Sequence, residues 1–395
     1  MAAYCHVASL WNKKIRTMVR GHRDTWRILR RQIGTARYVW FHAASLGEFE
    51  QGRPLMEWLR VKHPQKKILL TFFSPSGYEV RKNYKGADVV CYLPFDTPFN
   101  ALKFVNRARP EAAYFIKYEF WRNYIEVLHR RNIPCYSVSA IFRPKQIFFR
   151  SYGRNYAKVL QRITHLYVQN EESKELLAGI GVTNVTVVGD TRFDRVLSIR
   201  NAAKALPLVE RFAGCWKVLV AGSTWPADEQ LIINYFNNHS EMKLVLAPHV
   251  VSEDHLRAIE DKVLRPCIRY SRATLKNVAE ADCLLIDSYG LLSGIYRHAT
   301  VAYVGGGFGA GIHNVPEAAV YSIPVIIGPN NRKYREAQAL LQIGACKEVR
   351  NATDFQNQMD VFLFNKEALR KAGEAAGEYI LAHAGATRKI LENIR

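Results

Sequence analysis

Short apolar runs and amphipathic stretches alternate along most of the chain. Twelve runs have the length and apolar content of strands, and between most of them lie 10–18 residues with helical patterning, for example 49–62, 228–238 and 252–263. The strand-like runs are 38–44, 67–73, 89–95, 111–118, 133–140, 165–170, 185–190, 216–222, 243–248, 283–287, 300–307 and 323–328. Nearly continuous apolar strands that alternate with helices are typical of parallel sheets covered on both faces. The pattern therefore predicts an α/β fold.

Twelve strands are too many for one open sheet, so we expect two doubly wound, Rossmann-like domains. The polar, Pro-containing stretch 196–214 predicts a linker between a domain at 1–195 and a second at 215–395. From Lys366 onward the chain has no strand signal, and one or two Ala-rich helices are expected to pack back on the body. Ligands of such sheets bind beyond the carboxyl ends of the strands, so two facing domains predict a central cleft with its functional residues just after strands.

The charge of the chain is strongly asymmetric. It carries 56 Lys+Arg against 35 Asp+Glu, a formal charge of +21, and 48% of its residues are hydrophobic, which excludes disorder as its main state. Residues 1–160 hold 29 basic and 10 acidic residues, whereas 161–395 hold 27 and 25. The first part therefore favours an anionic partner, and charge alone leaves nucleic acid, an anionic membrane surface and a phosphorylated substrate open.

Two segments of the first part suit an anionic lipid surface. Arg16, Arg20, Arg23, Arg27 and Arg30 recur at helical spacing and predict one basic helix face. The alternative is a solvated charged face on a capping helix. Basic and bulky apolar residues also interleave in 141–152, where core packing with a charged rim is the alternative.

No segment is expected to span a membrane or to act as a signal peptide. The apolar runs fall short of the roughly 20 residues of a spanning helix, and 1–11 lacks a cleavage site after a proper apolar region. The seven cysteines are scattered and never form a CxxC pair, and the twelve histidines show no metal-ligand spacing. We expect a reducing compartment, no bound metal and no cofactor.

Three carboxylates follow strands and are candidates for acid–base chemistry. Glu48 follows a strand that ends in small residues (43–45) and lies at the predicted start of a helix, and Glu50 is its competitor. Glu119 follows the fourth strand in the same way and is expected to open a helix over 119–131. A general base needs such a carboxylate within reach of a hydroxyl. For both Glu48 and Glu119 the alternative is a stabilising charge at a helix N-terminus.

Hydroxyls and glycines mark further strand ends. Ser74, Ser76 and Gly77 can meet oxygens of a sugar or phosphate, or else simply cap a helix. In the second half, Ser223 and Thr224 end one strand, and Pro248 and His249 end the next. A lone histidine in such a place is more often an ordinary loop residue than a ligand.

The strongest local signal is a run of five glycines within 305–311. It permits close approach of the backbone to a ligand, and Asn314 and Pro316 suit the start of a helix. The site fits a nucleoside monophosphate better than a dinucleotide, because no matching acid follows about 20 residues on. Glu317 is placed to reach ribose hydroxyls.

In their order and spacing these segments resemble the Kdo (3-deoxy-D-manno-octulosonic acid) transferases of lipid A biosynthesis. The resemblance runs from about Tyr38 to Lys389. The pieces that carry it are HAASLGE (42–48), LTFFSPSG (70–77), YLPFD (92–96), Glu119–Asn123, SVSA (137–140), VQNEES (168–173), GDTRFDR (189–195), AGST (221–224) and VGGGFGAGIHNVPEA (304–318). The family has the two-domain GT-B architecture, in agreement with the predicted fold.

The resemblance implies an inverting transfer of Kdo from CMP-Kdo to a hydroxyl of a lipid A precursor, lipid IVA. Glu48 matches the family's catalytic base and Glu119 its second essential acid. The implied CMP-Kdo-binding residues are Ser223, Thr224, Pro248, His249, Gly306, Gly307, Asn314 and Glu317. Gly47, Ser74, Ser76 and Gly77 fall on the acceptor side.

The implied location is the cytoplasmic face of the bacterial inner membrane, peripheral or monotopic, with the basic N-terminal half against the anionic membrane surface and no nucleic acid as partner. Three rival functions remain. A nucleotide-sugar epimerase has the same architecture but no need of lipid, and another lipid-linked glycosyltransferase would differ in its substrates. A polyanion-binding protein leaves the glycine run and the two strand-end glutamates unexplained.

Overall fold

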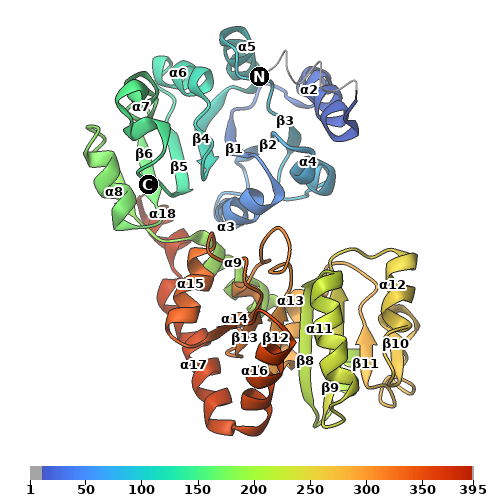
Figure 1. The fold of residues 1–395 in the computed structure, drawn as a ribbon. Coiled ribbons are helices and arrows are strands. Elements are labelled where there is room, and N and C mark those ends of the chain that lie inside the picture. The colour runs from blue at the N-terminus through green and yellow to red at the C-terminus, as the bar shows by residue number, and fades with distance from the viewer. Residues whose placement is uncertain (1–10, 394–395) are drawn as a thin grey trace. The chain divides into compact units, whose positions relative to one another are not determined.

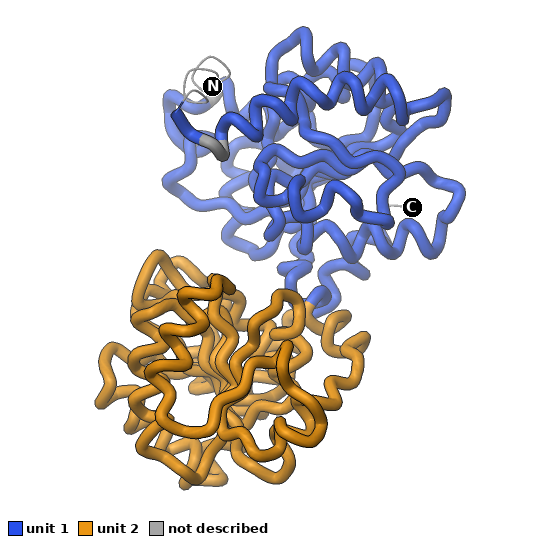
Figure 2. Tube along the Cα trace, turned by 90° about the vertical axis from the view of Figure 1, so that its right-hand side faces the viewer, with its two compact units in different colours: residues 1–195, 384–395 blue, residues 196–383 orange. Residues whose placement is uncertain are grey.

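The computed structural model describes residues 11–393, and they form two compact units (Figures 1 and 2). One unit contains residues 1–195 and 384–395, and the other contains residues 196–383. The segment 196–214, for which the sequence predicts a linker, holds most of α9 and all of α10. The last helix, α18, groups with the N-terminal unit, where it contacts α3. The prediction that the opening segment holds no signal peptide concerns residues that lie mainly outside the described part.

The elements of the first unit alternate strictly between strand and helix after α2. They are α2 (Lys13–Gln32), β1 (Tyr38–Ala43), α3 (Leu46–Lys62), β2 (Lys67–Phe72), α4 (Pro75–Arg81), β3 (Val89–Tyr92), α5 (Pro98–Ala108), β4 (Pro110–Ile116), α6 (Arg122–Arg130), β5 (Cys135–Ala140), α7 (Arg154–Leu160), β6 (His165–Val168), α8 (Glu171–Ala178), β7 (Val185–Val187), α9 (Thr191–Ala202), which continues into the second unit, and α18 (Ala386–Asn393).

The second unit also alternates strands with helices, and five of its seven described strands have only three or four residues. Its elements are α10 (Pro207–Ala213), β8 (Lys217–Thr224), α11 (Pro226–Asn237), β9 (Met242–Pro248), α12 (Glu253–Glu260), β10 (Cys267–Arg269), β11 (Cys283–Leu285), α13 (Leu292–Ile295), β12 (Val301–Val304), α14 (Pro316–Ala319), β13 (Val325–Ile327), α15 (Arg335–Gln342), β14 (Cys346–Glu348), α16 (Ala352–Phe364) and α17 (Lys366–His383).

Within residues 11–393 the strands form two seven-stranded parallel sheets. Their orders are β3-β2-β1-β4-β5-β6-β7 and β10-β11-β9-β8-β12-β13-β14. The predicted α/β class with two doubly wound sheets is confirmed, and α17 and α18 confirm the helices expected after Lys366. Two strands escaped the sequence prediction, β10 and β14, because each has only three residues and includes charged ones, Arg269 in β10 and Lys347 and Glu348 in β14.

Each strand of the first sheet sends alternate side chains to opposite faces. Trp40 lies in the core cluster with α5 and α6, whereas its neighbour Phe41 lies in the cluster with α3 and α18. Both side chains are buried, so this strand is apolar on both faces, as a parallel strand between two helical layers must be.

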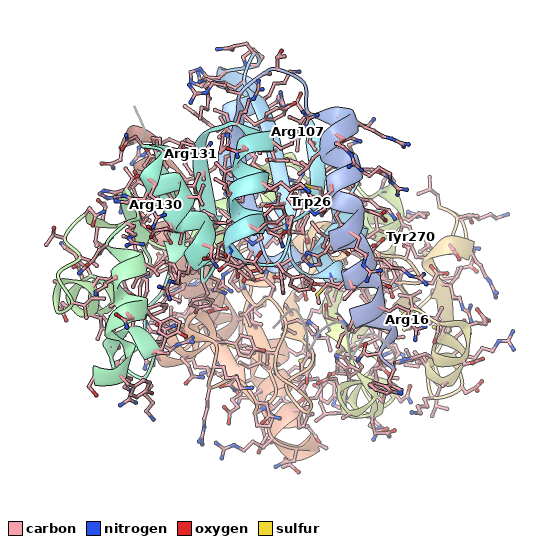
Figure 3. The ribbon with its side chains drawn as sticks, turned by 90° about the horizontal axis from the view of Figure 1, so that it is seen from above. Arg16, Trp26, Arg107, Arg130, Arg131 and Tyr270 are labelled. Carbon is pink, nitrogen blue, oxygen red and sulfur yellow. The ribbon has the colours of Figure 1, made fainter. Side chains whose placement is uncertain are left out.

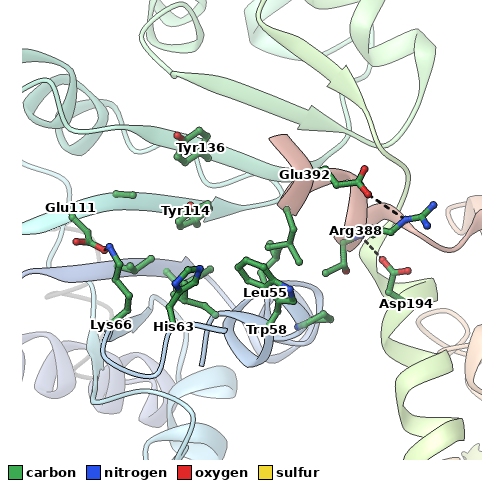
Figure 4. A pocket seen from close by; sticks show the side chains of 17 residues that line it. Leu55, Trp58, His63, Lys66, Glu111, Tyr114, Tyr136, Asp194, Arg388 and Glu392 are labelled. Carbon is green, nitrogen blue, oxygen red and sulfur yellow. Dashed lines mark hydrogen bonds and ion pairs between the residues drawn. The ribbon is translucent and has the colours of Figure 1, made fainter. Parts of the chain in front are cut away.

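On the α3 and α18 face the helical cover leaves a cavity of about 1020 Å³ (Figure 4). Leu55 and Trp58 of α3 and the stacked rings of Tyr114 and Tyr136, whose centroids lie 5.0 Å apart, line it. None of the site residues expected from the sequence lines this cavity, so its size alone does not mark the functional site.

Helix α2 is fixed to the first unit by its apolar side. Met18 and Val19 pack against Tyr92, and the Thr25 hydroxyl donates to the Tyr92 carbonyl at 2.8 Å. The guanidinium of Arg107 donates to carbonyls at the end of α2, including that of Ile33 at 2.9 Å, which satisfies groups that a helix terminus otherwise leaves unpaired. The five arginines at helical spacing, from Arg16 to Arg30, all lie exposed, as the pattern predicts.

Candidate active site

Glu48 lies at the start of α3, directly beyond β1. Its Oε2 accepts hydrogen bonds from the backbone N–H and from the hydroxyl of Ser45, both at 2.8 Å, which makes a capping box. Glu48 therefore does serve as a charge at the helix N-terminus, as the alternative interpretation expects, but this role engages only one of its two carboxylate oxygens. Within the described residues Oε1 forms no hydrogen bond. Burial, and next the charge of Glu119, raise the pKa of Glu48 against the opposing effects of Ser45 and Lys117.

The competing carboxylate, Glu50, is committed elsewhere. Arg81 donates to its Oε1 and Arg195 to its Oε2, each at 2.8 Å, and Arg53 lies 3.6 Å from the latter oxygen. Both oxygens of this carboxylate are therefore already engaged by guanidinium groups and are not available to a substrate hydroxyl. Glu48 is therefore the stronger candidate of the two.

Glu119 lies in the loop between β4 and α6. The expectation that it opens a helix is wrong, because α6 begins only at Arg122. Lys117 adopts a left-handed backbone conformation with φ of 66°, which turns the chain sharply at the end of the strand. In this loop Glu119 Oε2 accepts from the indole Nε1 of Trp121 at 2.6 Å and lies 3.2 Å from Nε2 of His42.

The loop after β2 contributes hydroxyls and a close backbone approach. Ser74 is the N-cap of α4, accepting from the Ser76 N–H at 3.3 Å, so the capping alternative holds for it. A Cβ at Gly77 would lie 2.3 Å from the Phe72 ring, so this glycine lets α4 approach β2. Gly47 is exposed, and a Cβ there would meet nothing within 4 Å.

The strand order brings these loops together at one edge of the first sheet. β2, β1 and β4 are adjacent, and all their carboxyl ends point the same way. The strand order reverses between β1 and β4, which is where open α/β sheets bind ligands. Glu48, Glu119 and the loop after β2 therefore share one rim, and the electrostatic effect of Glu119 on Glu48 is a consequence of that neighbourhood.

The second group of expected site residues follows three adjacent central strands of the other sheet, β9, β8 and β12. Ser223 takes a left-handed conformation, φ 54°, at the irregular end of β8. The hydroxyl of Thr224 is buried and donates to Glu229 at 3.1 Å, so only the backbone of Thr224 is left to contact a ligand. Pro248 is buried at the end of β9.

His249 belongs to a stack of three rings. Its imidazole lies 4.8 Å from the Trp225 ring and 4.4 Å from the His313 ring, each inclined by 26°. The indole N–H of Trp225 donates to Nε2 of His313 at 3.2 Å. Burial, and next the neighbouring His249, lower the pKa of His313, which keeps its ring neutral at physiological pH. Trp225 and His249 are exposed, so the stack offers a flat surface to a ligand.

The glycine turn after β12 is built by close packing of backbone on backbone. A Cβ at Gly307 would lie 2.6 Å from the Cα of Gly328, and Gly306 has φ of 92°. The buried carboxylate of Asp228 holds this turn, accepting from the Gly306 N–H at 2.9 Å and from the Tyr303 hydroxyl at 2.7 Å. It also accepts from the Trp225 N–H at 2.9 Å, which ties the turn to the ring stack.

Beyond the glycine turn, Asn314 and Glu317 contact each other. The Asn314 amide donates to Glu317 Oε1 at 2.7 Å, and the Ser293 hydroxyl donates to Glu317 Oε2 at 3.0 Å. The sequence reasoning did not identify Trp225, Asp228, His313 or His42 as site residues. His313 and His42 lie inside quoted motifs and so had a signal, whereas Asp228 reads as an ordinary first-turn helix acid.

Comparison with known proteins finds similarity to one class of transferases. A family model described as 3-deoxy-D-manno-octulosonic-acid transferase (kdotransferase) matches residues 18–195. The chain is 28% identical to a 3-deoxy-D-manno-octulosonic acid transferase of Aquifex aeolicus over 87% of this chain and 91% of that protein. It is 24% identical to the enzyme of that name from Haemophilus influenzae, with 90% and 86% covered.

Among solved structures, the fold is similar to that of UDP-GlcNAc 2-epimerase from Neisseria meningitidis bound to UDP-GlcNAc. The TM-score is 0.63 at 14% identity, with 90% of this chain and 99% of the other covered. The fold is the GT-B architecture, and the curated relatives indicate a glycosyltransferase. The chain is similar to the 3-deoxy-D-manno-octulosonic acid (Kdo) transferases, through residues 18–195 and through relatives that cover most of its length. That similarity supports Kdo transfer in lipopolysaccharide synthesis.

Proposed function

We propose that the protein transfers Kdo from CMP-Kdo to a hydroxyl of the lipid A precursor lipid IVA, with inversion at the anomeric carbon and Glu48 as general base. The observation that carries this proposal is the state of Glu48. Its Oε2 is held by Ser45, its Oε1 is unengaged within the described residues, and its pKa is raised by burial and by Glu119. A raised pKa makes a carboxylate a better proton acceptor near neutral pH.

The step follows from these groups. As the acceptor oxygen attacks the anomeric carbon, its proton passes to Glu48 and the new C–O bond forms. The bond from that carbon to the phosphate oxygen breaks, and CMP leaves as an anion that needs no strong acid. Glu119, beside Glu48, is placed to orient the acceptor hydroxyl, and Gly47, Ser74, Ser76 and Gly77 to line the acceptor side.

The donor is proposed to bind the second unit. Ser223, the Gly306–Gly307 turn and His249 offer backbone and ring contacts to the phosphate and base, with Pro248 and Thr224 contributing through their backbone. Asn314 and Glu317 are placed for the sugar hydroxyls, in keeping with their mutual hydrogen bond. Backbone N–H groups suit an anion that must be bound and released, because they keep a fixed direction.

The proposed acceptor is a phosphorylated lipid, and the first unit has a surface suited to an anionic bilayer (Figure 3). On α5, Phe99 is 70% and Leu102 45% exposed, and the groove beside them toward α2 is lined by Trp26, Arg30, Lys103 and Arg107. The groove toward α6 carries Arg122, Arg130 and Arg131. Exposed apolar residues between two basic grooves are the pattern of a surface that lies on anionic headgroups.

We therefore place the protein at the cytoplasmic face of the bacterial inner membrane. None of the helices in residues 11–393 is both long enough and apolar enough to cross a bilayer. In segment 141–152 the rings of Phe142 and Phe148 pack with Phe120, 5.3 and 5.4 Å from it, so we assign these two rings to the core and not to the lipid surface.

The proposed membrane contact is tested by sedimentation with two kinds of vesicle, one containing phosphatidylglycerol and one of pure phosphatidylcholine. The protein should bind the anionic vesicles, and the double variant Phe99→Ser/Leu102→Ser should bind them at least about tenfold more weakly, since each buried side chain contributes about 1.5–3 kcal/mol. Leu264→Ser, which changes an even more exposed side chain of the second unit, should have no effect. Equal binding of all three proteins would place the membrane contact elsewhere.

The activity is tested by incubating the purified full chain with freshly made CMP-Kdo and tetraacylated lipid A precursor. CMP release that depends on the lipid, together with a product heavier by one or more Kdo residues, supports the transfer. A nucleotide-sugar epimerase would instead act on UDP-GlcNAc without lipid. No lipid-dependent CMP release, under conditions in which a known Kdo transferase is active, contradicts the proposal.

A further inference from the structure

A buried chain of hydrogen bonds runs behind Glu119 in the first unit. Trp40 and His42 are two residues apart on β1, so their side chains lie on the same face, and the strand register pairs His42 with Thr71 of β2. The Trp40 indole donates to Thr71 Oγ1 at 2.8 Å, and Thr71 Oγ1 lies 2.8 Å from Nδ1 of His42. The other ring nitrogen of His42 faces Glu119.

The tautomer of His42 follows from the partners of its two ring nitrogens. Thr71 has one hydroxyl hydrogen, and Nδ1 of His42 at 2.8 Å is a closer acceptor for it than the Phe41 carbonyl at 3.3 Å. With that bond the ring proton is on Nε2, directed at Glu119 Oε2 at 3.2 Å. In the opposite tautomer Nε2 would accept from the Trp121 indole at 3.0 Å, but its lone pair would also face the carboxylate oxygen, and we therefore favour the proton on Nε2.

Glu119 consequently receives two donors on a single oxygen. In the favoured tautomer Nε2–H of His42 points at Oε2, and Nε1–H of Trp121 donates to the same oxygen at 2.6 Å, which is shorter than its 3.0 Å approach to Nε2 of His42. Within the described residues Oε1 forms no hydrogen bond. Two donors from different elements, one behind β1 and one in the β4–α6 loop, fix both the position and the plane of this carboxylate.

We propose that His42 is a positioning residue for the transfer, holding Glu119 through its Nε2–H so that Oε1 is presented to the acceptor hydroxyl. The inference rests on the proposed function, in which Glu119 contacts the acceptor. Side chains that orient an active-site group from behind typically contribute about 10- to 100-fold to activity. His42 is fully buried and does not touch the acceptor, so its effect passes through Glu119.

The test compares kcat, the KM for CMP-Kdo and the KM for the lipid acceptor in four variants of the full chain. His42→Leu should lower kcat about 10- to 100-fold with the KM for CMP-Kdo nearly unchanged. His42→Gln, whose amide can donate from a similar position, should recover most of that loss. Trp121→Phe, which removes the second donor, should give a loss of the same kind. His165→Leu is the matched control, because His165 also pairs with a threonine at 2.8 Å, Thr186, but faces no carboxylate.

A double variant separates positioning from a merely structural role. In a Glu119→Gln background the additional change His42→Leu should have little further effect on kcat, because both changes act through the same carboxylate. The positioning role is overturned if His42→Leu lowers kcat in the Glu119→Gln background as much as it does in the wild type. It is also overturned if His42→Leu alone keeps the wild-type kcat while Glu119→Gln is impaired. Wild-type kcat in Glu119→Gln itself would instead refute the proposed function of that acid.

The tautomer is read without any activity measurement. Long-range ¹H–¹⁵N spectra of protein labelled in histidine, with the His42 signal assigned by its loss in His42→Gln, should show the proton on Nε2. A proton on Nδ1 overturns the inference even where His42→Leu fails to fold.

Discussion

Removing the carboxylate of Asp228 should destabilise the glycine turn that the proposed donor site uses. Asp228 is fully buried and accepts from Gly306 N–H, Trp225 N–H and the Tyr303 hydroxyl. In Asp228→Ala the donor of exposed Trp225 can turn to water, whereas those of Gly306 and Tyr303 stay buried. At about 1–3 kcal/mol for each stranded donor, the loss is about 2–6 kcal/mol.

Urea unfolding of the full chain measures this loss, and hydrogen–deuterium exchange of the peptide around Gly306 assigns it to the second unit. Asp228→Asn keeps one acceptor oxygen and should fall between the wild type and Asp228→Ala. Asp254→Ala, an exposed change on α12, should lie within about 0.5 kcal/mol of the wild type. An Asp228→Ala protein that loses less than about 1 kcal/mol, with unchanged exchange at Gly306, would refute the role given to this carboxylate.

Two further predictions concern Glu48 and the glycine turn. Because Glu48 must be ionised to act as the base, kcat/KM should be full above its raised pKa and fall as the pH decreases through that pKa. Ser45→Ala removes a hydrogen bond that lowers the pKa of Glu48, so the acid limb of the pH profile should move to higher pH. An acid limb that does not move would count against Glu48 as the titrating base. Gly307→Ala should lower the free energy of unfolding in urea by about 1–3 kcal/mol and weaken CMP binding, because its Cβ would meet backbone at 2.6 Å. The control Gly309→Ala, whose nearest contact would be at 3.7 Å, should match the wild type. Equal stability of the two variants would disprove the close packing at Gly307.

The fold could be predicted because its signal is local. Strands buried on both faces must be apolar along their whole length, and the runs that hold Trp40 and Val245 show this plainly. Three-residue strands such as β10 give no such signal, since burial of so few residues depends on their neighbours. The pairing of 384–395 with the first unit depends on contacts such as Asp194 with the Gly385 N–H, which no local pattern encodes.

The site could be predicted only as far as strand ends mark it. Glu48 and Glu119 were found because each follows an apolar run, but the choice between Glu48 and Glu50 is decided by Arg81 and Arg195, which are distant in sequence. Thr224 looked like a ligand-facing hydroxyl, and its side chain turns inward to Glu229. Burial of a polar side chain and the identity of its partner are tertiary facts, and they explain why His42 and Asp228 went unnoticed.

The most direct test of the central claim is single-turnover transfer by Glu48→Gln, compared with the wild type and with Glu50→Gln. Loss of a general base typically lowers the rate about 10²- to 10⁴-fold. We predict a loss of that size for Glu48→Gln, with CMP-Kdo binding by calorimetry unchanged, and a much smaller loss for Glu50→Gln. Transfer by Glu48→Gln at close to the wild-type rate would contradict the assignment of Glu48 as the base.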